Sequence, residues 1–183
     1  MKKSISLTII LLLASSRAHS NPTLENSVWG RAAASAGVNV ATLYSIAVQE
    51  SGMRWRDGTF RPWPWTLNVN AGKNGIKAGP RRYASKEAAA QALKEMLGKG
   101  VTNVDIGLMQ VNYYWHGDKV SSPYALLDPQ TNITVAAGYL KALNKHNVSQ
   151  TVADYHAPSN PARGKTYVQH VKHYEKIIHE KLK

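Results

Sequence analysis

The chain has 183 residues, a net charge of +12 and no cysteine. This length favours a single domain that can bury a substantial core. The lack of cysteine excludes disulfide bonds and a lipid anchor on an N-terminal cysteine.

The first twenty residues have the pattern of a secretory signal peptide. Lys2 and Lys3 form a charged start, residues 5–14 are apolar, and Ala18 and Ser20 provide the small residues of a cleavage site after Ser20. A retained membrane anchor would need about 20 apolar residues, roughly twice the length of this run. We therefore expect residues 1–20 to be removed and residues 21–183 to form one exported domain without a membrane span. The two lysines and the absence of cysteine fit a bacterial periplasm best.

The charge points to anionic partners. Loss of Lys2, Lys3 and Arg17 with the signal peptide would lower the net charge from +12 by three, to +9. A basic exported protein meets cell-wall polymer, lipid head groups or nucleic acid. Nucleic acid is not expected, because the compartment argues against it and no compact nucleic-acid-binding motif is present.

Helical patterns dominate the chain, with one short β-rich segment. In chain order, the sequence predicts helices at 24–36 and 40–51, a β-hairpin around 65–75, helices at 86–98 and 129–146, a proline-containing loop at 154–164, and a closing helix at 165–183. The predicted fold class is therefore mainly α, of the α+β kind: a single helical domain with a small β-hairpin insert.

The helix at 40–51 ends its apolar face with a carboxylate. Leu43, Ile46, Ala47 and Glu50 are spaced by three and four residues, so they share one face. Partial burial and the negative end of the helix dipole both disfavour an anion, so we expect the pKa of Glu50 to be raised. A Glu that stays protonated near neutral pH can act as a general acid. The alternative is that Glu50 turns into solvent at a frayed helix end.

Three short motifs follow one another in a recognisable order. They are Glu50-Ser51, "GLMQVN" at residues 107–112, and Tyr155-His156. With these motifs, the chain resembles the soluble lytic transglycosylase (SLT) family over residues 24–174. The long segment between the first two motifs further resembles members that accompany conjugation or secretion systems.

The resemblance implies a lysozyme-like fold and a lytic transglycosylase that cleaves peptidoglycan. Glu50 would be the sole catalytic acid/base. It would protonate the glycosidic oxygen between N-acetylmuramic acid (MurNAc) and N-acetylglucosamine (GlcNAc), and then take the proton of the muramic 6-hydroxyl as that oxygen attacks the anomeric carbon. The product is a 1,6-anhydro end, formed without water and without a second carboxylate.

Four aspartates are candidates for a second carboxylate beside Glu50. We expect them in loops or at helix starts, with Asp128 as a helix cap, and none has an evident claim to be a second catalytic carboxylate; they are Asp57, Asp105, Asp118 and Asp128.

The resemblance implies four substrate-binding residues: Ser51, Gln110, Asn112 and Tyr155. Gln110 offers both a donor and an acceptor to a sugar, and Tyr155 would lie beside Glu50 and orient an N-acetyl group. Gly107 is expected to let the backbone approach a sugar closely. Ser51, Asn112 and Tyr155 each have a plain alternative, as a helix-end, loop or core residue. His156 departs from the family pattern, in which Asn is usual at this position.

Several neighbouring residues have weaker claims. Asn132 is expected to support the cleft without reacting. Trp63 and Trp65 either stack on sugar rings or, as we favour, pack the hairpin against the domain. Residues 113–115, which are Tyr-Tyr-Trp, are candidates to line the same groove.

We expect no cofactor and no metal, because the histidines at 170, 173 and 179 lack the spacing of a zinc protease. The expected partners are peptidoglycan glycan strands and a secretion or conjugation machine, and the protein is expected to be a monomer. Two alternatives stay open: a lysozyme-type hydrolase (muramidase), or a non-catalytic wall-binding assembly subunit.

Overall fold

The computed structural model of the chain describes residues 22–144 and 147–181, so the expected signal peptide at 1–20 lies outside the described residues. The helices are α1 (Pro22–Glu25), α2 (Val28–Ala36), α3 (Val40–Ser51), α4 (Lys86–Gly98), α5 (Tyr113–His116), α6 (Pro129–Leu143), α7 (Val148–His156) and α8 (Pro161–Lys181), with 3₁₀ turns η1 (Gly117–Lys119) and η2 (Pro123–Leu127). The strands are β1 (Gly52–Arg54), β2 (Phe60–Pro62), β3 (Thr66–Val69), β4 (Gly79–Arg82), β5 (Val104–Ile106) and β6 (Val111–Asn112).

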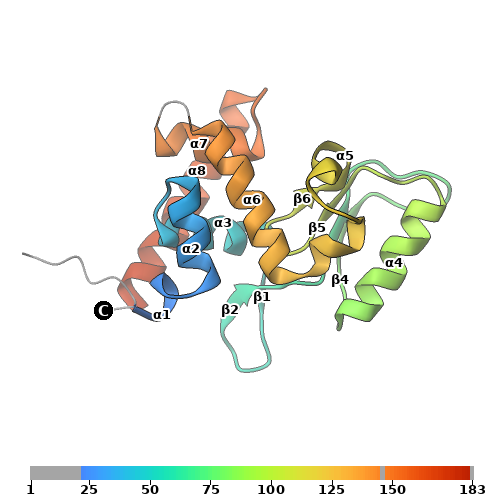
Figure 1. Ribbon diagram of the computed structural model, residues 1–183, viewed down its shortest axis with the longest axis horizontal. Coiled ribbons are helices and arrows are strands. Elements are labelled where there is room, and N and C mark those ends of the chain that lie inside the picture. Colours follow the sequence, from blue (N-terminus) through green and yellow to red (C-terminus); the bar gives the residue numbers. More distant parts are fainter. Residues whose placement is uncertain (1–21, 145–146, 182–183) are drawn as a thin grey trace, which may run out of the picture.

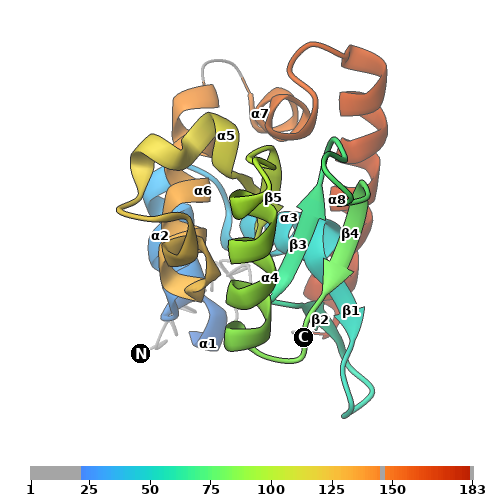
Figure 2. The same cartoon turned by 90° about the vertical axis from the view of Figure 1, so that its right-hand side faces the viewer.

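The elements form two groups at opposite ends of the molecule, as Figure 1 shows. Helices α1, α2, α3, α7 and α8 lie at one end, the four-stranded sheet and α4 lie at the other, and α6 passes between them. Helix α3 contacts α2, α8 and both strands of the β1–β2 pair. Helix α4 is in front in Figure 2, at the outer end of the molecule, where it packs on β3 and η2.

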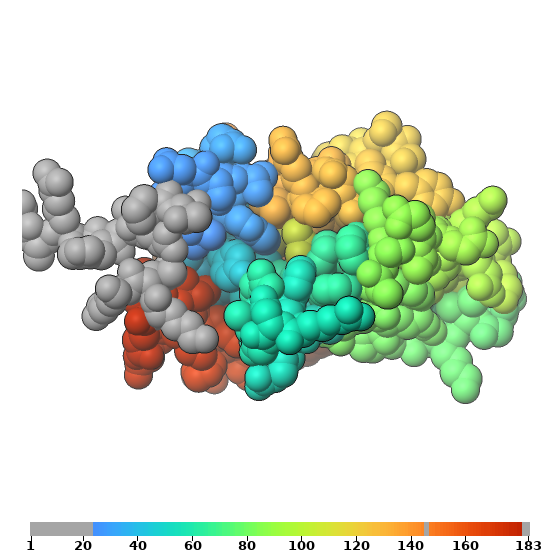
Figure 3. All heavy atoms as spheres, turned by 90° about the horizontal axis from the view of Figure 1, so that it is seen from below, coloured from blue at the N-terminus to red at the C-terminus, as the bar shows by residue number. Residues whose placement is uncertain are grey.

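The β part is larger than the expected hairpin. Strands β3 and β4 pair antiparallel, with Thr66 opposite Arg82, so the hairpin is confirmed. However, β3 also pairs with β5, with Leu67 opposite Ile106, and β6 follows in the sheet order β4-β3-β5-β6. A separate pair, β1–β2, contributes to the teal surface between the red α8 and the green α4 in Figure 3. The β3–β5 pairing joins segments that are distant in the chain, so local sequence patterns do not reveal it.

Several predicted boundaries are wrong, including the end of the helix predicted at 129–146, which the structure places at Leu143. The first helix is interrupted, because Ser27 begins a new helix: its Oγ accepts a hydrogen bond from the Trp29 amide. The predicted loop at 154–164 begins only at Ala157, since α7 continues through His156. Helix α8 then starts at Pro161, because proline is tolerated in the first turn of a helix.

The middle of the core is α3. Leu43, Ile46 and Ala47 are completely buried, as the apolar spacing predicted. Asn39 caps the start of the helix, and the helix ends at Ser51, just before Gly52, as expected. The buried stripe therefore leads directly to Glu50 in the last turn. No helix within the described residues combines the length and apolar character needed to cross a membrane.

Candidate active site

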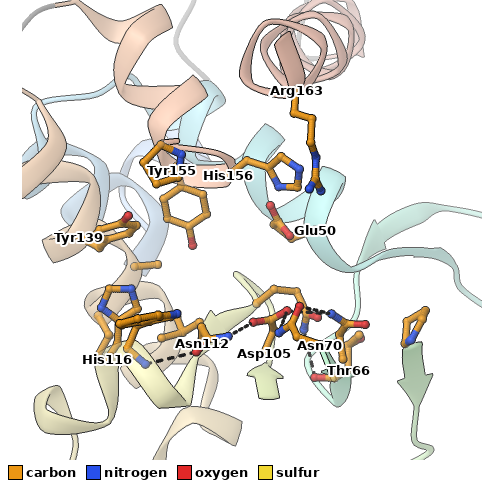
Figure 4. A pocket seen from close by; sticks show the side chains of 18 of the residues that line it. Glu50, Thr66, Asn70, Asp105, Asn112, His116, Tyr139, Tyr155, His156 and Arg163 are labelled. Carbon is orange, nitrogen blue, oxygen red and sulfur yellow. Dashed lines mark hydrogen bonds between the residues drawn. The ribbon is translucent and has the colours of Figure 1, made fainter. Parts of the chain in front are cut away.

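A pocket of about 780 Å³ lies where the helical group meets the sheet. Its walls come from the end of α3, the four strands β3–β6, and helices α5 to α8. Figure 4 shows Glu50 at the end of α3, with Tyr155 and His156 of α7 and Arg163 of α8 on the same side, and polar residues of the sheet on the other. Residues of all three sequence motifs therefore meet in one pocket.

The carboxyl group of Glu50 is set in surroundings that favour its neutral form. Burial raises its pKa from 4.5 to about 7, a hydrogen bond from Tyr167 opposes this rise, and the negative charge of Asp105 adds to it. The predicted rise in the pKa of Glu50 is therefore confirmed, with burial as its main cause. A carboxyl group with this pKa can give and take a proton near neutral pH.

Tyr167, on α8, contacts Glu50 directly. Its hydroxyl donates a hydrogen bond to Glu50 Oε1 over 2.5 Å, and the residue is 4% exposed. Burial raises the pKa of Tyr167 well above its usual range, so the hydroxyl stays a donor. The ring stacks on His156 with 4.4 Å between ring centroids. The sequence reasoning missed Tyr167, although its position four residues before the buried Val171 places it on the core face of the helix.

The "GLMQVN" motif forms the tight turn that leads from β5 into β6. Three side chains, each from a different helix, hydrogen-bond to the backbone of this turn. Ser51 Oγ donates to the Leu108 carbonyl over 2.7 Å, and Tyr155 Oη donates to the Met109 carbonyl over 2.7 Å. Asn132 Oδ1 accepts from the Met109 amide over 2.8 Å. Asn132 therefore supports the cleft as expected, and the turn ties α3, α6 and α7 to the sheet.

Gly107 is required for a reason other than the one expected. It has a φ of +83°, and a Cβ there would lie 2.5 Å from Asn132 Nδ2. The glycine is buried and is not among the residues that line the pocket. It therefore allows the backbone to approach Asn132, not a sugar.

The four expected substrate-binding residues do not all reach the pocket. Gln110, Asn112 and Tyr155 line it, whereas Ser51 is completely buried and does not. The Gln110 amide nitrogen donates to the carbonyls of Gly107 and Thr66, over 2.9 and 3.2 Å, so its Oε1 is the atom left for a ligand. The position of Ser51 supports a structural role, linking the end of α3 to the turn.

Asp105 corrects an expectation. The sequence predicts it in a loop with no claim to chemistry, but it lies on β5 and lines the pocket. Its neighbours Val104 and Ile106 are completely buried, so strand alternation turns Asp105 to the opposite face, toward the pocket. This alternation of apolar, acidic and apolar residues is the sequence signal that was overlooked. Asp128, by contrast, caps α6 as predicted, with Oδ1 accepting from the Thr131 amide.

Aromatic residues are divided between the pocket and the scaffold. Trp115 lines the pocket and is 70% exposed, so its ring is available to a ligand. Trp63 instead donates from Nε1 to the Tyr83 carbonyl and packs edge-on against Trp55 and Trp65, which confirms the packing role. Among the residues that the structure describes, no group of three or more His, Cys, Asp or Glu is arranged to hold a metal ion.

Comparison with protein-family models matches residues 83–177 to the Transglycosylase SLT domain. Searches of curated proteins and of solved structures found no significant match. The matched segment contains Gln110, Asn112 and Tyr155 but begins after Glu50, whose place in the site comes from the geometry of α3. Because the match covers more than half of the 183 residues, the chain belongs to the Transglycosylase SLT domain family.

Proposed function

We propose that this protein is an exported peptidoglycan lytic transglycosylase that cleaves the β-1,4 bond between MurNAc and GlcNAc and leaves a 1,6-anhydro-MurNAc end. One observation carries the proposal. Glu50, whose pKa is raised to about 7, lies in the same pocket as Gln110, Asn112 and Tyr155 of the family-matched segment.

In the proposed reaction Glu50 acts twice. Protonated Glu50 gives its proton to the glycosidic oxygen, and the bond from the anomeric carbon to that oxygen breaks with its electron pair going to the oxygen. The muramic 6-hydroxyl then attacks the anomeric carbon and returns its proton to Glu50. The acid is thereby regenerated without water.

The surrounding residues position Glu50 and the sugar. Tyr167 fixes one carboxyl oxygen of Glu50, which orients the other toward the pocket. Gln110 Oε1 is available to an N–H or O–H of the sugar, and the exposed ring of Trp115 offers a flat surface to a pyranose ring.

We further propose that the protein acts in the periplasm and opens the wall locally for a secretion or conjugation apparatus. The residues at 1–20, the basic charge and the long segment between Glu50 and the "GLMQVN" turn support this proposal. The positive charge attracts the domain to an anionic wall polymer.

The substitution Glu50→Gln tests whether the protein is an enzyme. It keeps the size of the side chain but removes the acid, so release of soluble fragments from purified cell walls should fall by about 10² to 10⁴-fold. Glu95→Gln, which alters an exposed Glu on α4 paired with Lys99, should leave the rate unchanged. Equal release by Glu50→Gln and the unaltered protein would exclude Glu50 as the acid, whereas no release by the unaltered protein would favour a non-catalytic wall-binding subunit.

A lysozyme-type hydrolase is the second candidate. It is favoured by Asp105, because a second carboxylate that lines the pocket with Glu50 is the arrangement that most glycoside hydrolases use. The two candidates differ in the acceptor, which is the muramic 6-hydroxyl in one and water in the other.

A further inference from the structure

A second carboxylate lies across the pocket from Glu50. In Figure 4, Glu50 on α3 and Asp105 on β5 occupy opposite sides of the same pocket. Asp105 is only partly buried, so a ligand in the pocket can approach its carboxylate. The proposed transglycosylase reaction of Glu50 gives Asp105 no role.

Three neutral amides hold the Asp105 carboxylate. Asn68 and Asn70 donate to Oδ2 over 2.8 and 2.9 Å, and Asn112 donates to Oδ1 over 2.6 Å. Among the described residues, no Lys, Arg or His forms an ion pair with it. The amides therefore fix the carboxylate without cancelling its charge, and the acceptor capacity of Oδ1 is not exhausted.

We propose that Asp105 is a second functional carboxylate of the pocket, whose negative charge stabilises the positive charge that develops on the reacting sugar. This inference rests on the proposed function of Glu50. As the glycosidic bond breaks, the sugar ring becomes oxocarbenium-like. An anion that is already fixed in place stabilises this charge without having to reorient. No bond forms to Asp105 and it transfers no proton, so Glu50 remains the only acid/base.

The same negative charge acts on Glu50. Repulsion from Asp105 adds to the effect of burial in raising the pKa of Glu50. The two carboxylates thus have different surroundings and different roles: the apolar stripe of α3 favours a protonated Glu50, and the amides around Asp105 favour an anion.

The other titratable groups around the pocket include histidines and tyrosines whose pKa values differ from that of Glu50. Those that face it from other elements are Arg82 on β4, His116 on α5, Tyr139 on α6, Tyr155 and His156 on α7, and Arg163 on α8, while Tyr167 contacts Glu50 itself. Burial lowers the pKa of His116 and His156 below 6.5 and raises those of the three tyrosines above 10. Glu50 is therefore the group expected to set a fall in activity near pH 7.

The test compares pH–rate profiles for wall cleavage by the full mature protein. Asp105→Asn removes the charge with little change in size, and Asp105→Ser removes it with a smaller side chain that need not match all three amides. Glu50→Gln serves as the inactive reference, and Glu95→Gln as a surface control that loses the same charge. We expect both Asp105 variants to react about 10²-fold more slowly. We also expect their loss of activity at high pH to begin at a lower pH, because the pKa of Glu50 falls.

A merely structural role for Asp105 would lower the rate without moving the alkaline limb of the profile, and that result would overturn the inference. Rates within threefold of the unaltered protein would overturn it as well, and so would failure of both variants to fold. If Glu50→Gln is inactive while the Asp105 variants behave like the unaltered protein, only this inference fails. If Glu50→Gln stays active, the proposed function itself fails.

Discussion

Tyr167 of α8 donates a hydrogen bond to Oε1 of Glu50, at the end of α3, over 2.5 Å. The two residues come from helices far apart in the sequence that pack against each other. The bond opposes the rise in the pKa of Glu50 that burial causes, and it also restricts the orientation of the carboxyl group. Tyr167 is thus a positioning residue for the proposed acid.

Removing this hydrogen bond should change both the rate and its pH dependence. Tyr167→Phe deletes only the hydroxyl, so the pKa of Glu50 should rise and the alkaline limb of the pH–rate profile should move to higher pH. A hydrogen bond to a charged group contributes about 1.5 to 3 kcal/mol, so a loss of at least about tenfold in rate is expected. Tyr174→Phe, on the same helix but stacked on Phe60, is the matched control. An alkaline limb that stays in place or moves down would contradict the assignment.

The unaltered enzyme should be most active below neutral pH. Glu50 must be protonated to act as the acid, and its pKa of about 7 means that the protonated fraction falls as the pH rises through 7. Initial rates of cell-wall solubilisation between pH 4 and 9 would show this decline. An optimum above pH 8 is incompatible with protonated Glu50 as the acid.

Glu50 should also make folding stability depend on pH. Its pKa is about 7 in the folded chain against 4.5 as the ordinary value, so between these values the folded state binds more protons and stability falls as the pH rises. Glu50→Gln does not titrate and escapes this loss. The stability of Glu50→Gln relative to the unaltered protein should therefore grow by up to about 3 kcal/mol from pH 4 to pH 8. Urea unfolding at both pH values measures the change, and a difference that does not vary with pH would contradict the raised pKa of Glu50.

Substitution of two glycines with similar φ angles distinguishes the cost of backbone strain from the cost of a steric clash. Gly107 and Gly75 have φ of +83° and +81°, but a Cβ would meet Asn132 at Gly107 and open space at Gly75. Gly75→Ala should destabilise by about 1 kcal/mol through backbone strain. Gly107→Ala should destabilise by about 3 kcal/mol or more, because overpacking adds to the strain. Thermal unfolding of the two variants gives the comparison, and equal losses would mean that the contact with Asn132 is unimportant.

The helical part of the fold could be predicted from the sequence because its signals are local. Apolar residues at helical spacing located α3, and Asp128 caps α6 as its position indicated. Asn39 and Ser85 cap α3 and α4 in the same way. The SLT domain is lysozyme-like, so the mainly α, α+β class is confirmed. Strand β5 was missed because it pairs with β3, which lies far away in the chain, and β6 was missed because it is only two residues long.

The candidate site was predictable only in part, for a similar physical reason. The raised pKa of Glu50 followed from its place at the end of a buried stripe, which is a local property. Asp105 and Tyr167 were missed because their importance comes from which residues they face, and that depends on the packing of β5 and α8 around α3. Ser51 shows the opposite error: it adjoins Glu50 in sequence, but its side chain points into the core.

The most direct test of the proposed function is the chemistry of the cut glycan end. Purified sacculi digested by the unaltered protein, and in parallel by Glu50→Gln, can be analysed for their released muropeptides by mass spectrometry. We predict 1,6-anhydro-MurNAc ends with the unaltered protein and almost no release with Glu50→Gln. Reducing MurNAc ends would contradict the transglycosylase and identify a hydrolase, in which water takes the place of the 6-hydroxyl.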